Sequence, residues 1–145
     1  MGKKKSNHLS LVQFPNSIIE PFTITSPETA QYNCVAWVLG DTEHWWEADE
    51  DYLWLDNLNF DNTLSTMQSF FQNFGFKPVD KPNLKNGIEK IALFSEDGIY
   101  CTHVAKQISA KRWTSKLGIS YDITHTLTSM EKGIYGDVVM ILQKI

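Results

Sequence analysis

The chain has 145 residues, of which 42% are hydrophobic and 21% are charged, and its formal net charge at pH 7 is −4. This composition is typical of one globular domain and excludes a wholly disordered chain, because the apolar residues suffice to offset chain entropy. No apolar run approaches the ~20 residues that a membrane-spanning helix needs. The acidic balance argues against a nucleic-acid-binding domain, since such domains usually carry a basic surface. We therefore expect neither a nucleic acid nor a membrane as partner.

The cysteine content and the N-terminal residues bear on the compartment. Two cysteines cannot build a disulfide framework, which is typical of a reducing environment. No apolar stretch follows the lysines at 3–5, as a signal peptide would require. We therefore expect a cytoplasmic protein, with delivery elsewhere by a partner left open. Residues 1–10 are predicted to be a disordered tail, and residues 11–145 to form a single domain. Residues 11–20 predict a short strand or an extended arm.

Two helices are predicted in the first half of the chain. The sequence Ser26-Pro27-Glu28 is a helix-start signal, so we expect a helix over residues 29–39 that ends at Gly40. A second helix is predicted to begin at Asn62 or Thr63 and to end before a glycine at position 75. Its apolar residues recur at helical spacing and indicate a core-facing side: Leu64, Met67, Phe70, Phe71 and Phe74.

The segment between these helices, residues 41–56, is acidic and aromatic at once. Seven acidic residues are interleaved with Trp45, Trp46, Tyr52 and Trp54. One interpretation is a surface loop that its tryptophans attach to the body of the domain. The other is one wall of a binding cleft, in which the three tryptophans and the neighbouring acids would contact a basic or polar substrate.

The second half of the chain predicts a sheet. Strands are expected over residues 89–94, 100–108, 112–117 and 137–143, with a short helix over residues 126–131. Residues 76–86 are predicted to be a connection that holds one short strand at most. Helices that precede an antiparallel meander are typical of an α+β domain rather than a βαβ one.

Cys34 and His103 are the residues most suited to catalysis. Cys34 falls early in the first predicted helix, where backbone N–H groups favour a thiolate. Its own N–H, together with Gln31 or Asn33, could hold an oxyanion. His103 begins a predicted strand, from which it could reach the thiol as a general base. The ordinary alternatives are a buried thiol that packs as a small hydrophobe and a structural histidine.

A third polar residue would be needed to orient the imidazole, as Asp or Asn does in other triads. The following strand offers Ser115, and Asp122 comes shortly after it. Cys101 lies two residues before His103, so on one strand the two side chains would share a face. We interpret Cys101 as structural.

These pieces carry a resemblance to a known family. Asn33-Cys34 opening a helix, followed by a strand that begins His103-Val104-Ala105, resembles the papain-like cysteine hydrolases, especially the small bacterial CHAP and NlpC-type amidase and peptidase domains. The resemblance covers residues 31–118. The motifs Tyr-Asn-Cys-x-Ala-Trp, Thr-His-Val-Ala and Trp-Thr-Ser-Lys-Leu-Gly are also similar to those of short uncharacterised bacterial proteins.

The resemblance implies a papain-like fold, with N-terminal helices packed on an antiparallel sheet. It implies Cys34 as nucleophile, His103 as base, and an orienting residue around Ser115. The activity it implies is cleavage of an amide or isopeptide bond in a peptide or protein through a thioester, as in a peptidase, amidase or deamidase. No cofactor is expected.

Two other kinds of site were weighed. Cys34, Cys101, His103 and His125 are of zinc-ligand types, but they lack the paired spacing of a zinc site, so no metal is expected. A non-catalytic module that binds a basic partner through residues 41–56 is the alternative function. Cysteine reactivity separates this alternative from a hydrolase.

Overall fold

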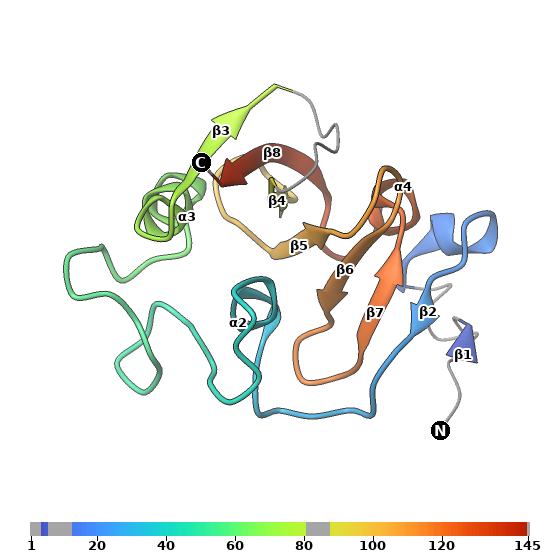
Figure 1. Ribbon diagram of the computed structural model, residues 1–145, viewed down its shortest axis with the longest axis horizontal. Coiled ribbons are helices and arrows are strands. Elements are labelled where there is room, and N and C mark those ends of the chain that lie inside the picture. The colour runs from blue at the N-terminus through green and yellow to red at the C-terminus, as the bar shows by residue number, and fades with distance from the viewer. Residues whose placement is uncertain (1–3, 6–12, 81–87, 145) are drawn as a thin grey trace.

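The computed structural model describes residues 4–5, 13–80 and 88–144. These residues form one sheet in the order β1-β2-β7-β6-β5-β4-β8-β3, with every neighbouring pair antiparallel (Figure 1). The strands are β1 (Lys4–Lys5), β2 (Thr23–Ile24), β3 (Phe76–Val79), β4 (Lys90–Ser95), β5 (His103–Gln107), β6 (Trp113–Lys116), β7 (Asp122–His125) and β8 (Asp137–Lys144). An antiparallel sheet combined with a few separate helices confirms the α+β class.

The helices are η1 (Pro15–Ile18), which is a 3-10 helix, α2 (Cys34–Val38), α3 (Leu64–Gln72) and α4 (Leu127–Met130). The prediction for α3 is confirmed, because the Thr63 hydroxyl accepts a hydrogen bond from the Thr66 amide and Gly75 has a φ of 93°. Gly40 likewise follows the end of α2 with a φ of 79°.

The predicted start of α2 is wrong by five residues. We expected helix from residue 29, but the backbone at Asn33 is extended and its side chain caps a helix that begins at Cys34. Asparagine is among the strongest N-cap residues, and here it outweighs the Ser-Pro-Glu signal upstream. As a result, Cys34 is the first residue of α2.

Two hydrophobic cores lie against the sheet. Successive residues of β4 alternate between them: Ile91 and Leu93 belong to the core under α2 and α3, and Ala92 and Phe94 to the core that Phe14 and α4 cover. In Figure 1, α2 (cyan) and α3 (green) lie on one side of the strands, whereas α4 and the blue η1 lie together on the other. The sheet therefore separates two packed layers.

The strands expected from the sequence are confirmed with small shifts at their ends, and α4 is found inside the predicted 126–131. The sequence analysis missed β2 and β7, and predicted a strand or arm where η1 forms. The expected tail contains the paired β1, while residues 1–3 and 6–10 lie outside the described residues. Residues 81–86 of the expected connection also lie outside them. Within the described ranges, no helix has the length and apolar character to span a bilayer.

A tight turn between α4 and β8 places Tyr135. Gly133 and Gly136 pair across this turn, and the φ of Gly136 is 77°. A Cβ at Gly136 would lie 2.2 Å from the Ser95 carbonyl oxygen, and one at Gly133 would lie 2.6 Å from that of Gln13. Both positions are thus restricted to glycine by close backbone approach.

Candidate functional site

Cys34 lies where α2 begins and meets the sheet. Three backbone amides interact with its sulfur, those of Val104, Val35 and Cys34 itself. The amide of Val104 can do so because β5 pairs with β6 only at Lys106 and Gln107, which leaves the first residues of β5 outside that ladder. The sheet is thus open between β5 and β6 at the place where α2 packs on both strands.

The resting state of the Cys34 thiol differs from the expectation. Burial raises its pKa above the ordinary value, and this effect outweighs the three amides and the positive charge of Lys116, which all lower it. The expected thiolate is therefore not the resting form at neutral pH. A nearby base must take the proton if this sulfur is to attack.

His103, the first residue of β5, is buried, with 2% of its surface exposed. Its Nε2 atom has no hydrogen-bond partner among the described residues. Burial, and secondarily the neighbouring His125, hold the pKa of His103 well below 6.5, so the ring is neutral at pH 7. A neutral imidazole with a free nitrogen is the form that a general base requires.

Tyr135 stacks on His103, with 4.1 Å between the ring centroids and 1° between the ring planes. Phe94 meets the same imidazole edge-on at 5.4 Å. Burial raises the pKa of Tyr135, and a charge on Cys34 would raise it further, so Cys34 lies within electrostatic range of the phenol. The sequence analysis did not identify Tyr135, whose only sequence signal is its place in Gly-Ile-Tyr-Gly.

One cavity of about 490 Å³ brings the main candidates together. Cys34, Val104, Cys101 and His103 line it from α2 and from the start of β5. Trp46 and Trp54 line it from the acidic segment 41–56, as the cleft interpretation expected. Trp54 stacks on Phe70 at 4.7 Å with 7° between the rings, and so rests on α3.

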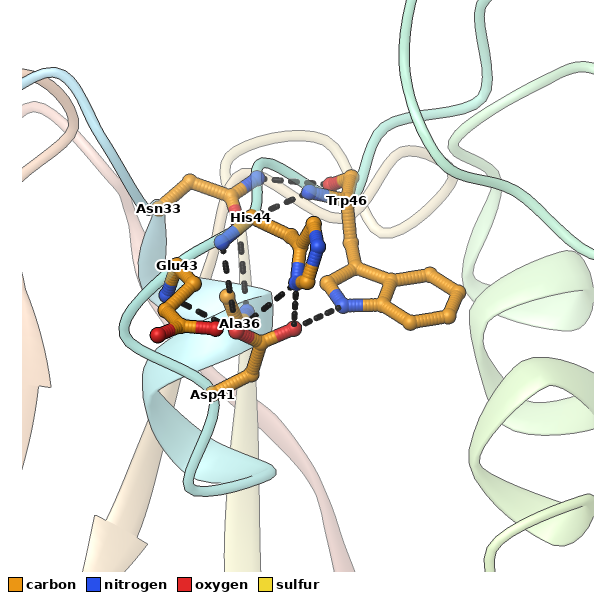
Figure 2. A network of polar contacts seen from close by, with 6 residues as sticks. All are labelled: Asn33, Ala36, Asp41, Glu43, His44 and Trp46. Carbon is orange, nitrogen blue, oxygen red and sulfur yellow. Dashed lines mark hydrogen bonds and ion pairs between the residues drawn. The ribbon is translucent and has the colours of Figure 1, made fainter.

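The segment 41–56 is attached to α2 by a polar network (Figure 2). Asn33 uses Oδ1 to accept from the Ala36 and Trp46 amides, while its Nδ2 donates to the Trp46 carbonyl at 2.6 Å. The carboxylate of Asp41 accepts from the Trp46 indole at 3.0 Å and from His44 at 2.9 Å. Asn33 therefore caps α2 and also, through its contacts with Trp46, fixes one wall of the cavity.

The network gives different roles to the residues expected near an oxyanion. Oδ1 of Asn33 is committed to capping and to Trp46, and one Nδ2 hydrogen goes to the Trp46 carbonyl, so a second Nδ2 hydrogen is the donor that its side chain could offer to an oxyanion. Gln31 is exposed and does not line the cavity, and its backbone amide donates to the Thr29 hydroxyl. The backbone amides around the Cys34 sulfur are the other donors that this location offers.

The two residues expected to orient His103 have other partners. Ser115 lies 2.9 Å from Nε2 of His125, whose Nδ1 lies 2.8 Å from the Thr126 carbonyl and donates to it. Asp122 lies on β7, two strands from β5, and accepts from Thr25 and from the Tyr32 hydroxyl. The contacts of Asp122 thus hold the segment that precedes α2, and that of Ser115 joins β6 to β7.

Two further expectations need correction. Trp45 does not line the cavity, because its indole donates to Glu47 and its ring packs on Tyr52. Cys101 precedes β5, so the expectation of one strand that carries both Cys101 and His103 does not hold; it packs in the α2 and α3 core and also lines the cavity. Burial raises the pKa of Cys101 to about 12, which fits the structural role expected for this thiol.

Lys116 is a charged group that the sequence analysis did not identify. It is fully buried on β6, and its ammonium donates to the carbonyls of Thr29 and Gly118 and lies 5.0 Å from the centre of the Tyr32 ring. Its charge lowers the pKa of Cys34 and therefore acts on the site from a distance. In the described part of the chain, no three metal-ligand side chains are grouped as a metal site.

Comparisons place the chain in a family. No curated protein and no solved structure matches it significantly. One family model matches residues 23–143, from β2 to near the end of β8, and so includes the whole cavity lining. The chain belongs to the family described as Domain of unknown function (DUF7689).

Proposed function

We propose that the protein is a papain-like thiol hydrolase that cleaves an amide or isopeptide bond through a thioester. One observation carries this proposal: Cys34 and His103 line the same cavity, and Nε2 of the buried His103 has no partner there among the described residues. A buried polar atom without a partner is costly, so its retention needs a reason, and proton transfer supplies one.

The proposed reaction begins with both groups neutral. Sγ of Cys34 attacks the substrate carbonyl carbon while His103 takes the thiol proton. The amides of Cys34, Val35 and Val104 donate to the negative charge as it develops. The C–N bond then breaks, and the amine leaves with the proton from His103. Water, activated by His103, hydrolyses the thioester, which releases the acid and restores the thiol.

In this scheme Tyr135 replaces the orienting carboxylate of other triads. Its ring fixes the plane of the imidazole by stacking, and the glycine-restricted turn fixes the position of its own backbone. Tyr135 is thus proposed as a positioning residue, and the nucleophile and base form a dyad.

Cysteine alkylation tests the proposal. Wild type, Cys34→Ser, Cys101→Ser and His103→Asn are treated with iodoacetamide from pH 6 to 10, and adducts are quantified by mass spectrometry. We expect Cys34 to be modified first, with Cys101→Ser unchanged. At pH 7.5, His103→Asn should slow the alkylation of Cys34 roughly tenfold or more, because no base then takes the thiol proton. The difference between the two rates should narrow as the pH rises toward 10, because more of the thiol then ionises without a base.

Equal Cys34 rates in wild type and His103→Asn at pH 7.5 would contradict the dyad. They would favour the alternative function, a non-catalytic module that binds a basic partner. That alternative is supported by the exposed acids of residues 41–56.

A further inference from the structure

The acids that line the cavity have no basic side chain to neutralise them. Glu47, Asp49 and Asp61 contribute to the lining, which contains no Lys or Arg among the described residues. In the same part of the chain, the ion pairs are His44 with Asp41 and Lys144 with Glu89, both away from this lining. Three acidic residues therefore line one cavity that has no Lys or Arg in its described lining.

The acidic surface continues beyond the cavity. A second hollow of about 390 Å³ shares Asp49 and Phe60 with it and adds Glu50 and Asp51. An extended ligand that leaves the cavity past Phe60 would thus meet further carboxylates. Such clustering of one charge sign in a hollow concentrates ligands of the opposite sign.

Aromatic rings lie beside these acids. Trp46 and Trp54 line the cavity, and their indole N–H groups are already bonded, to Asp41 and to the Asn59 carbonyl. They offer ring surface rather than further hydrogen bonds. Ring surface next to carboxylates is the combination that binds an ammonium or a guanidinium group, because both attract a cation.

The unpartnered His103 is a second, independent sign of a ligand. It lines the same cavity at 2% exposure, and no described residue bonds its Nε2. A polar group of a bound molecule would give Nε2 the hydrogen-bond partner that it lacks among the described residues. The nucleophile and the acids thus share one space, so a substrate held by its cation would present its carbonyl group within the same cavity as Cys34.

We propose that the cavity binds peptides with a lysine or arginine side chain next to the amide that Cys34 attacks. This inference rests on the proposed hydrolase function and names its substrate class. The cationic group lies between the carboxylates of Glu47 and Asp49 and the ring of Trp54, and the peptide carbonyl lies at Cys34.

The test separates binding from chemistry by using Cys34→Ser. Tryptophan fluorescence follows titration with four capped tripeptides of the form acetyl-Gly-X-Gly-amide, in which X is Lys, Arg, norleucine or Glu. Norleucine matches lysine in its apolar chain and lacks the charge. We expect Lys and Arg to bind roughly tenfold or more tightly than norleucine, and Glu most weakly, with the preference decreasing as salt rises.

Two variants made on Cys34→Ser give the matched comparison. Glu47→Gln with Asp49→Asn should reduce the Lys preference to within about threefold of norleucine. Glu43→Gln removes a charge from the same segment but outside the cavity lining, and should leave the preference unchanged. Equal binding of Lys and norleucine peptides, or a preference that survives the double substitution, would overturn the inference.

Activity of the wild-type protein on the same peptides distinguishes the two proposals. Selective binding without any cleavage would leave the cationic site standing and remove the hydrolase. Cleavage that is equally fast for the Lys, norleucine and Glu peptides would keep the hydrolase and remove the cationic preference.

Discussion

The imidazole of His103 lies flat against the phenol ring of Tyr135, 4.1 Å from centroid to centroid. The two residues are 32 positions apart in sequence, and they meet because β4 lies between β5 and β8 in the sheet. Phe94, on that intervening strand, contacts the edge of the same imidazole. His103 is therefore held by aromatic contacts, while its Nε2 keeps no described partner.

Substitutions at Tyr135 should separate its ring from its hydroxyl. Tyr135→Phe keeps the stacked ring, so we expect a change in unfolding free energy of less than about 1 kcal/mol and normal Cys34 alkylation at pH 7.5. Tyr135→Ala removes most of a partly buried side chain and should cost about 3 kcal/mol. Urea denaturation gives the stability, and mass spectrometry gives the alkylation rate.

The pH dependence of alkylation shows whether Tyr135 positions His103. Where Tyr135→Ala remains folded, its Cys34 rate should fall at pH 7.5 and recover as the pH rises toward 10, as in His103→Asn. A uniform change at both pH values would mean that Tyr135 contributes to stability alone. Slow Cys34 alkylation in Tyr135→Phe would mean that the hydroxyl group of Tyr135, and not its ring, positions His103.

Gly136 and Gly98 form a matched pair for the turn that holds Tyr135. Both have a φ close to 77°, but an added Cβ meets open space at Gly98 and the Ser95 backbone at Gly136. Gly98→Ala should therefore cost only the backbone strain, about 1 kcal/mol. Gly136→Ala should cost more than about 4 kcal/mol or prevent folding. Equal thermal midpoints for the two variants would contradict this account.

Stability should decrease as the pH falls below 6.5. Burial lowers the pKa of His125 to about 4 and that of His103 well below 6.5, so both rings stay neutral in the fold while the unfolded chain takes up protons. Their contribution is complete above pH 6.5 and is lost as the pH falls toward the folded-state pKa. For His125 alone the loss by pH 4 is on the order of 3 kcal/mol.

Urea midpoints between pH 7.5 and 5 measure this effect, since few ordinary carboxylates titrate in that window. His125→Asn should reduce the slope, because the folded and unfolded states then differ by one proton fewer. A midpoint that does not depend on pH would show that these histidines take up protons equally in the folded and unfolded states, against the lowered pKa values.

Asp41 should decide whether residues 41–56 stay attached. Burial alone would raise its pKa, but hydrogen bonds from the Glu43 amide, the Trp46 indole and His44 together lower it. The contacts by which Asp41 holds the segment should therefore persist at pH 4. They should be lost only as the pH falls through the lowered pKa of Asp41. Asp41→Ala should cost about 1–2 kcal/mol and shift the tryptophan emission to longer wavelength.

Asp41→Asn provides the control for that substitution. An asparagine oxygen can still accept from the Trp46 indole, so this variant should keep most of the native emission. The same emission in Asp41→Ala as in wild type would mean that Asn33 is sufficient to hold the segment.

The sequence predicted the elements whose signals are local. Thr63 as a cap, Gly40 and Gly75 as helix ends, and the apolar side of α3 depend on residues within a few positions, and all are found. The start of α2 was wrong because two competing caps lay seven residues apart, Ser26 and Asn33, and propensity alone does not rank them.

The candidate site was predictable only in part, for a related reason. Cys34 and His103 stand in short motifs, and they do line one cavity. The partners of the imidazole and of the thiol come from distant strands, so no spacing reveals Tyr135 or Lys116. Ser115, expected to orient His103, has its hydroxyl bonded to His125 on the neighbouring β7 instead. Side-chain direction in a sheet depends on register, which the sequence did not specify.

The attachment of residues 41–56 through Asn33 and Asp41 has a consequence for protein engineering. Glu47 and Asp49 are exposed and belong to neither core, so their exchange should change stability by no more than about 0.5 kcal/mol. The proposed reactivity, in contrast, rests on residues of α2 and β5. The proposed ligand preference could thus be changed on this one segment, from cationic to neutral or anionic, without altering the proposed nucleophile and base.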